Sequence, residues 1–198
     1  MFRIGNPTCK RSSSRLPDYS PHTLVFNAAR NLAPGGYVEL QDVDVIMGSD
    51  DGTLTEDTTM YKWCRLLDEA AGKFNRSFER TTKFKDLLKE AGFVDIIETR
   101  FKWPSNRWPK DKKFKELGAW NNENASSALE ALTMAPFTRG LGWSREEVEV
   151  FLTDLRKDWN NPKIHAYWPM YVISSVVCCC ANMFLVALSM LGSLKLKC

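Results

Sequence analysis

The chain contains the stretch Leu32-Ala33-Pro34-Gly35-Gly36-Tyr37-Val38-Glu39-Leu40-Gln41-Asp42, and this stretch decides its fold. Pro34 cannot continue a helix, and the two glycines after it tolerate positive φ, so a tight turn is predicted. The residues that follow predict a short buried strand over residues 37–45. In α/β sheets, ligands bind beyond the carboxyl ends of the strands, and Asp42 lies near such an end.

The sequence around this stretch predicts an alternation of helices and strands. Helical spacing of apolar residues occurs over residues 23–31, 56–72, 84–91, 114–120 and 144–158, with a further helical stretch over 125–132. Ser144 and Glu147 form a capping box at the start of the last helix. Aromatic and β-branched residues predict strands over residues 93–101 and 163–174. Strands that alternate with helices in this way indicate an α/β fold.

Three segments of the chain differ in composition. Residues 1–20 are rich in serine and arginine, have no apolar periodicity, and predict a disordered leader. Residues 21–174 carry the predicted helices and strands and form the expected folded domain. Residues 175–198 are an apolar tail with the run Cys178-Cys179-Cys180.

The tail leaves two interpretations open. No charged residue occurs over residues 170–194, and a helix of that length would span a bilayer and anchor the domain by its C-terminus. Alternatively, the first part is a final strand and the remaining 17 residues, 178–194, lie at the lower limit for a membrane span. The aromatic and β-branched residues up to Ile173 favour a strand first, and membrane contact through the tail stays an option.

The cysteines and histidines do not predict a metal site. None of the six cysteines has Cys-x-x-Cys spacing, and no histidine stands at ligand spacing beside them. The pattern also differs from a secreted disulfide framework, which favours a reducing compartment. We therefore expect the protein in the cytoplasm or nucleus, with the membrane as the alternative that the tail leaves open.

The charge balance does not favour a nucleic-acid partner. The formal net charge of +3 arises from 27 basic and 24 acidic residues, so no strong field surrounds the chain. Residues 102–115 combine basic and aromatic side chains, a pattern that can grip single-stranded nucleic acid. The acidic residues Asp111 and Glu116 reduce the net positive charge of this segment, so a solvated loop is the favoured interpretation.

Several segments resemble the fungal LaeA-like methyltransferases, which are S-adenosylmethionine-dependent class I enzymes linked to the control of secondary metabolism. The stretch quoted first is similar to their turn and strand L-K-P-G-G-W-V-E-x-Q-D. Further matches, in order, are Ser49-Asp50-Asp51-Gly52-Thr53-Leu54, Lys89-Glu90-Ala91-Gly92-Phe93-Val94-Asp95, Trp108-Pro109-Lys110-Asp111, Lys115-Glu116-Leu117-Gly118, Phe137-Thr138-Arg139, Leu141-Gly142-Trp143-Ser144 and Asn161-Pro162-Lys163-Ile164-His165-Ala166-Tyr167. The resemblance covers residues 28–173. It implies the C-terminal half of a Rossmann-like sheet, with a helical lid inserted between two final antiparallel strands.

The resemblance implies S-adenosylmethionine as cofactor, no metal, and a methyl acceptor that the sequence does not identify. The family binds its cofactor with a glycine-rich loop after the first strand, and no Gly-x-Gly precedes Pro34 here. We therefore expect a truncated family member that is weakly active or inactive as this chain. The alternative is a non-catalytic interaction module that binds a protein partner through its open sheet edge, with C-terminal membrane anchorage as a further option.

Three polar residues near the end of the first strand are candidates for ligand binding. The resemblance places Gln41 and Asp42 near the cofactor and Asp44 near the substrate. Two carboxylates there could bind an amine or a hydroxyl group. Alternatively, they solvate the strand end and cap a loop, which is the interpretation we favour because fold position alone is weak evidence.

Four further residues are expected on the substrate side: Trp108, Trp120, His165 and Tyr167. His165 could act as a general base, or it could be a structural histidine with satisfied hydrogen bonds, which we favour. The tryptophans belong to the predicted insertion. They could line a pocket for an aromatic or apolar acceptor, although packing within a small lid is favoured.

Overall fold

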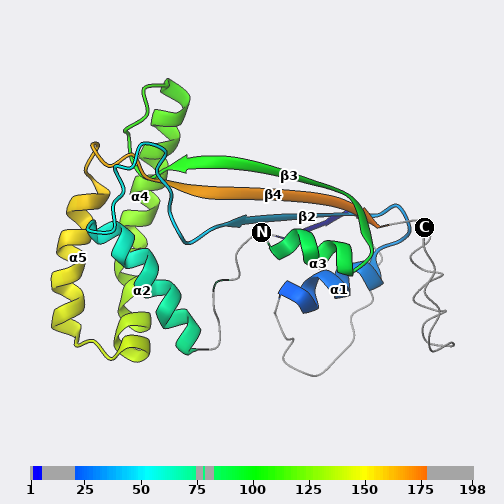
Figure 1. The fold of residues 1–198 in the computed structure, drawn as a ribbon, viewed down its shortest axis with the longest axis horizontal. Helices are drawn as coiled ribbons and strands as arrows, with labels where there is room; N and C mark the ends of the chain where they lie inside the picture. Colours follow the sequence, from blue (N-terminus) through cyan, green and yellow to red (C-terminus); the bar gives the residue numbers. More distant parts are fainter. Residues whose placement is uncertain (1, 6–20, 75–77, 79–82, 178–198) are drawn as a thin grey trace. The chain divides into compact units, whose positions relative to one another are not determined.

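The computed structural model describes residues 2–5, 21–74, 78 and 83–177. Its strands form one sheet in the order β1-β2-β4-β3 (Figure 1). The strands are β1 (Phe2–Gly5), β2 (Tyr37–Val43), β3 (Phe93–Pro104) and β4 (Tyr167–Val177). β1 pairs antiparallel with β2, and the arrows in Figure 1 show that β4 runs opposite to β2 and β3. The fold is thus mixed α/β, and the predicted antiparallel direction of the last two strands is confirmed.

The chain packs as two compact units. The first comprises Met1–Asp42, Arg80–Thr99 and Tyr171–Cys198, and the second comprises Val43–Glu79 and Arg100–Met170. The core of the first unit is formed by buried side chains of α1 (Pro21–Asn31), α3 (Phe84–Glu90) and the sheet. Its central members include Val25, Val38, Leu88 and Ile173.

The predicted glycine turn is confirmed. Gly35 has a φ of +79°, and a Cβ at Gly36 would lie 2.8 Å from the carbonyl oxygen of Ala33. The turn is fixed to β4, because the Gly35 N–H donates to the Val177 carbonyl at 3.1 Å and the Val177 N–H donates to Gly36 at 2.8 Å. Glycine is therefore required here both for its backbone conformation and for its missing side chain.

The second unit is mainly helical. It contains α2 (Thr59–Lys73), α4 (Lys112–Ala135), the π-helix η2 (Pro136–Leu141) and α5 (Arg145–Trp159). These helices share a core that includes the fully buried Met60, Leu129, Phe137, Leu152 and Trp159. The predicted capping box of α5 is confirmed, since the Ser144 hydroxyl accepts from Glu147 N–H and the Glu147 carboxylate accepts from Ser144 N–H.

The helical insertion differs from the prediction in one respect. Residues 114–120 and 125–132 were expected as separate helical stretches, but α4 is continuous over 24 residues. The asparagines between them disfavour helix locally. Here the Asn121 side chain donates to the carbonyl of Pro104 at 2.8 Å, and the Asn122 side chain donates to that of Trp159 at 3.1 Å. These tertiary hydrogen bonds hold the helix through its weakest turn.

Several element boundaries also shift, and two of these shifts have a clear local cause. α2 begins at Thr59 rather than at Glu56, because the Thr58 hydroxyl accepts from the Tyr61 N–H and provides the N-cap. β4 begins at Tyr167 rather than at residue 163, because the Ile164 N–H donates to the Asn161 carbonyl in a turn.

The terminal segments lie largely outside the described residues. Within the predicted disordered leader, Phe2–Gly5 form β1, whose register pairs Phe2 with Leu40. Residues 6–20 and 178–198 are not described, so the leader, the limits of the folded domain and the membrane interpretation of the tail stay predictions. Among the residues that are described, no helix combines the length and the apolar character needed to cross a bilayer.

Candidate functional site

The candidate site is built around the loop of residues 48–53 in the second unit. This loop follows β2 and is joined to the first residue of β4, because Gly48 and Tyr167 exchange two backbone hydrogen bonds of 2.9 Å. A Cβ at Gly48 would lie 3.2 Å from the Tyr167 ring, so the small residue allows the loop to approach the strand closely. The loop thus lies near the carboxyl end of β2, where α/β sheets place their chemistry.

Asp51 is the most highly connected side chain of the loop. One of its carboxylate oxygens accepts from the Ser49 hydroxyl at 2.7 Å, the Thr53 hydroxyl at 2.8 Å and the Thr53 N–H at 3.2 Å. The other oxygen lies 2.5 Å from Nδ1 of His165. The hydrogen bonds from Ser49, Thr53 and His165 hold the pKa of the Asp51 carboxyl well below its ordinary value.

His165 is oriented from three sides. The backbone N–H of His165 donates to the Thr53 hydroxyl at 2.8 Å, and the imidazole ring stacks on the Trp108 ring with centroids 4.9 Å apart. Trp108 is itself held by a 2.9 Å hydrogen bond from its indole N–H to the Ala166 carbonyl. Because the ionised Asp51 can only accept, the neutral imidazole carries its proton on Nδ1 and presents the Nε2 lone pair. The His165 side chain is 37% exposed.

A second cluster joins Asp50, Lys102 and Tyr167. The Tyr167 hydroxyl donates to one Asp50 oxygen at 2.8 Å, and the Lys102 ammonium donates to the other at 2.5 Å. Lys102 also lies 4.9 Å from the centroid of the Tyr167 ring. The bond from Lys102, followed by that from Tyr167, lowers the pKa of Asp50, whereas burial and the bond to Asp50 raise the pKa of Tyr167. Tyr167 therefore stays a neutral donor.

The structure brings three of the predicted substrate-side residues to one loop. Trp108 and His165 contact each other, and Tyr167 binds the aspartate adjacent to the one that holds His165. Trp120 does not join them: its side chain is 70% exposed and lines a separate groove on α4. Their roles in substrate binding stay predictions.

The structure places the predicted residues of the first strand within β2 or in the turn that follows it. The Asp44 carboxylate accepts from the Ile46 N–H at 3.1 Å and so caps the turn after β2. The Gln41 side chain donates to Glu39 at 2.6 Å, and Asp42 is an exposed residue of β2. Both belong to the first unit, and their proposed contact with a cofactor stays a prediction.

Sequence reasoning missed Asp50, Asp51 and Lys102 as site residues. A signal for the two aspartates was present, since they stand in a polar loop directly after a strand and within one of the matched family segments. Lys102 belongs to the basic segment of residues 102–115, which predicts a solvated loop and gives no sign of a specific carboxylate partner. Within the described part of the chain, no group of acidic, histidine and cysteine side chains is arranged to hold a metal ion.

Comparison with known proteins places the chain among fungal methyltransferases. It is 36% identical over 165 residues to the probable methyltransferase tdiE of Emericella nidulans, a match that covers 83% of this chain and 51% of that protein. It is 35% identical to the methyltransferase pytC of Aspergillus terreus, covering 83% of this chain and 50% of that one. The secondary metabolism regulator LAE1 of Cochliobolus heterostrophus is 37% identical over 139 residues, covering 69% of this chain and 45% of that protein.

The chain belongs by homology to the fungal LaeA-like methyltransferases, and it spans about half the length of the curated relatives it matches. No family model matches it. Among solved structures, phosphoethanolamine N-methyltransferase 2 of Haemonchus contortus, in complex with S-adenosylhomocysteine, aligns at 16% identity and a TM-score of 0.38. That alignment covers 82% of this chain and 30% of that protein.

Proposed function

We propose that this chain carries the methyl-acceptor side of an S-adenosylmethionine-dependent methyltransferase. Homology to fungal methyltransferases supports the class of reaction. The observation that carries the acceptor-side role is the pair formed by Asp51 and His165, at 2.5 Å. A methyl acceptor that attacks through a nitrogen or an oxygen loses a proton, and a histidine held by a carboxylate is suited to accept it.

The chain's own residues define what this site does. Asp51 fixes the proton of His165 on Nδ1, Trp108 fixes the plane of the ring, and Nε2 takes the proton of the acceptor. Asp50, held by Lys102 and Tyr167, provides a nearby carboxylate that could orient a cationic or hydroxyl-bearing acceptor. The acceptor itself is not defined by these contacts, since they fix a proton acceptor rather than a shaped pocket.

The residues present do not fit a complete site for the methyl donor. The sequence has no Gly-x-Gly before Pro34, and such a loop, with its backbone N–H groups, is how dinucleotide-type sites hold their cofactor. We therefore propose that these 198 residues bind S-adenosylmethionine weakly and have weak methyltransferase activity or none on their own.

Saturation-transfer NMR with S-adenosylhomocysteine, on the full 198-residue chain, tests the proposal. We expect weak binding, with a millimolar dissociation constant, and competition by S-adenosylmethionine but not by adenosine. Micromolar affinity in calorimetry would overturn the proposed loss of donor binding. No transfer at millimolar concentration would overturn the proposed weak binding of the donor.

The histidine's role has an independent test. The chain contains two histidines, so ¹⁵N spectra of the imidazole nitrogens can be assigned by comparing wild type with His22→Gln. We expect neutral His165 in the Nδ1–H form, and Asp51→Asn should shift it toward the ordinary Nε2–H form. Asp154→Asn, which removes an exposed carboxylate on α5 that also pairs with a basic side chain, is the matched control. The Nε2–H form in the wild-type protein would contradict the proposed base without any variant.

One observation favours a second candidate function, a non-catalytic interaction module. β3 lies at an edge of the described sheet and exposes Val94 and Ile97, the latter at 62%. Exposed edge strands pair with other chains. Ile97→Lys should abolish binding of a protein partner to this edge while leaving the weak donor binding intact. A pull-down and a donor titration, each with wild type and Ile97→Lys, therefore separate the two functions.

A further inference from the structure

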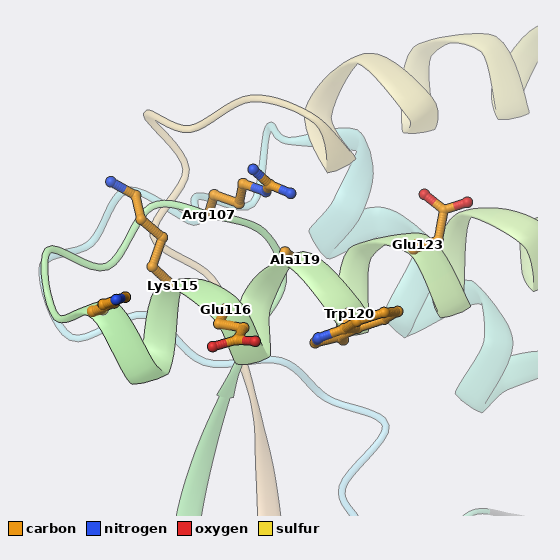
Figure 2. Close-up of a pocket in the computed structure, with 7 residues that line it drawn as sticks. Arg107, Lys115, Glu116, Ala119, Trp120 and Glu123 are labelled. Atoms are coloured by element: carbon orange, nitrogen blue, oxygen red, sulfur yellow. The ribbon is translucent and has the colours of Figure 1, made fainter.

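A groove of about 600 Å³ lies along the first turns of α4, under the loop that follows β3 (Figure 2). It does not contain the Asp51–His165 pair. One residue of the loop and one face of α4 line the groove. Its polar and aromatic lining residues are Arg107 of the loop and, on α4, Lys112, Lys115, Glu116, Trp120 and Glu123. Glu116 and Trp120 follow Lys112 at intervals of four residues, and Lys115 and Glu123 lie three residues after Lys112 and Trp120. This spacing places them on the same side of the helix.

The base of the groove is rigid. Gly118 lies so close to the loop that a Cβ would stand 2.0 Å from the Asn106 carbonyl oxygen. The Asn106 side chain, which is buried, donates to the carbonyls of Trp159 and Asn161 at 3.2 and 3.1 Å. Arg107 is therefore attached to a segment that cannot move away from α4. A ligand would meet a largely preformed surface, which lowers the entropy cost of binding.

The groove has an excess of positive charge that the protein does not neutralise. It contains three cationic and two acidic side chains. Among the described residues, none of these five takes part in an ion pair within 4.0 Å, although Lys115 and Glu116 are adjacent in sequence. An anionic group could therefore bind the cations without breaking an existing salt bridge.

Trp120 supplies the apolar surface of the groove. Its side chain is 70% exposed, the largest exposed fraction among the large hydrophobic residues of the described chain. A planar ring can stack on the indole and remove this apolar area from water. Tryptophan side chains are highly buried on average in folded proteins. Packing within the protein therefore does not account for the exposure of Trp120 beside three cations.

We propose that this groove binds a planar aromatic ligand with one carboxylate group. The ring stacks on Trp120, and the carboxylate binds Arg107 and the two lysines. Glu116 and Glu123 disfavour a polyanion such as single-stranded nucleic acid, because each added phosphate meets a carboxylate of the groove. The proposal does not depend on methyl transfer.

The test follows the indole N–H signals of the full chain in ¹H–¹⁵N spectra during titration with 2-naphthoate. Comparison with Trp120→Phe identifies the signal of Trp120 among those of the seven tryptophans. We expect this signal to shift saturably with 2-naphthoate and to shift only at higher concentrations of 2-naphthalenemethanol, which has the same ring system and no charge. Equal binding of the neutral compound, or no shift of Trp120, would overturn the proposal.

Arg107→Gln tests the charge contact. Binding of 2-naphthoate should weaken by about two- to fivefold, as for loss of one exposed ion pair. Arg156→Gln is the matched control, because it removes the same charge from α5, outside the groove. The remaining indole signals report whether each variant keeps its fold. Equal weakening in the two variants would overturn the proposal, as would displacement of 2-naphthoate by oligothymidylate at a lower concentration.

Discussion

The α-carbon of Gly118 in α4 lies directly against the backbone carbonyl of Asn106, so that any side chain at position 118 would overlap with it. Asn106 also accepts the Trp108 N–H at 3.0 Å through its side-chain oxygen. The contact therefore joins the helix, the loop after β3 and the tryptophan on which His165 stacks. A single close approach of two backbone segments positions both the groove and part of the candidate site.

Gly118→Ala should destabilise the protein although alanine favours helix. The added methyl group meets a backbone atom, and overpacking of this kind costs about 1–3 kcal/mol, more than the gain of about 1 kcal/mol from replacing a helical glycine. Urea unfolding followed by circular dichroism measures the difference. Gly72→Ala in α2, where no atom lies within 4 Å of the added Cβ, is the control and should be neutral or stabilising. Equal effects would contradict the prediction.

Asp158→Ala should weaken the start of α2, although Asp158 itself belongs to α5. Its carboxylate accepts from the N–H groups of Thr59 at 2.6 Å and Met60 at 3.3 Å, which are unsatisfied donors of the first helical turn. Loss of such a cap costs about 1 kcal/mol. Asp154→Ala, which removes only an exposed pair with Lys157, should cost much less. Hydrogen exchange of the Thr59 amide would show a local effect, and unchanged protection would refute it.

The pKa of Asp51 gives a pH dependence with a defined sign. Because its folded-state pKa lies below the ordinary value, its hydrogen bonds stabilise the protein above that ordinary value and are lost as pH falls. The difference in melting temperature between wild type and Asp51→Asn should therefore be largest at neutral pH and shrink below about pH 4. Melting curves at several pH values measure it. A difference that grows on acidification would have the wrong sign.

Cys64 should resist alkylation in the folded protein. It is buried in the core of the helical unit, and burial raises the pKa of its thiol to about 12, so the reactive thiolate is scarce at neutral pH. Mass spectrometry after iodoacetamide treatment should find Cys64 unmodified in the native chain and modified in urea. Modification of the native protein at the rate of the unfolded one would contradict the buried position.

Local signals in the sequence predicted the elements whose stability is local. The capping box of Ser144 and Glu147 and the Pro34-Gly35-Gly36 turn act within a few residues, and both are confirmed. The continuity of α4 could not be predicted, because the carbonyls that hold Asn121 and Asn122 lie on a strand end and on another helix.

The same distinction applies to the candidate site. His165 and Tyr167 were selected from a single short segment with chemically suitable side chains. Their carboxylate partners, Asp51 and Asp50, lie 114 and 117 residues earlier, so no local pattern joins them. The two backbone hydrogen bonds between Gly48 and Tyr167, and the bond from the backbone N–H of His165 to the Thr53 hydroxyl, bring these segments together.

β4 is the last of the described strands in the sequence, yet it lies between β2 and β3. During synthesis on the ribosome, β3 therefore emerges before the neighbour with which it pairs, and this sheet cannot close until translation has passed Val177. A nascent chain that pauses in α4 or α5 would leave β3 as a bare edge, open to other nascent chains. The yield of correctly folded protein should thus depend on how quickly translation proceeds from β3 to β4.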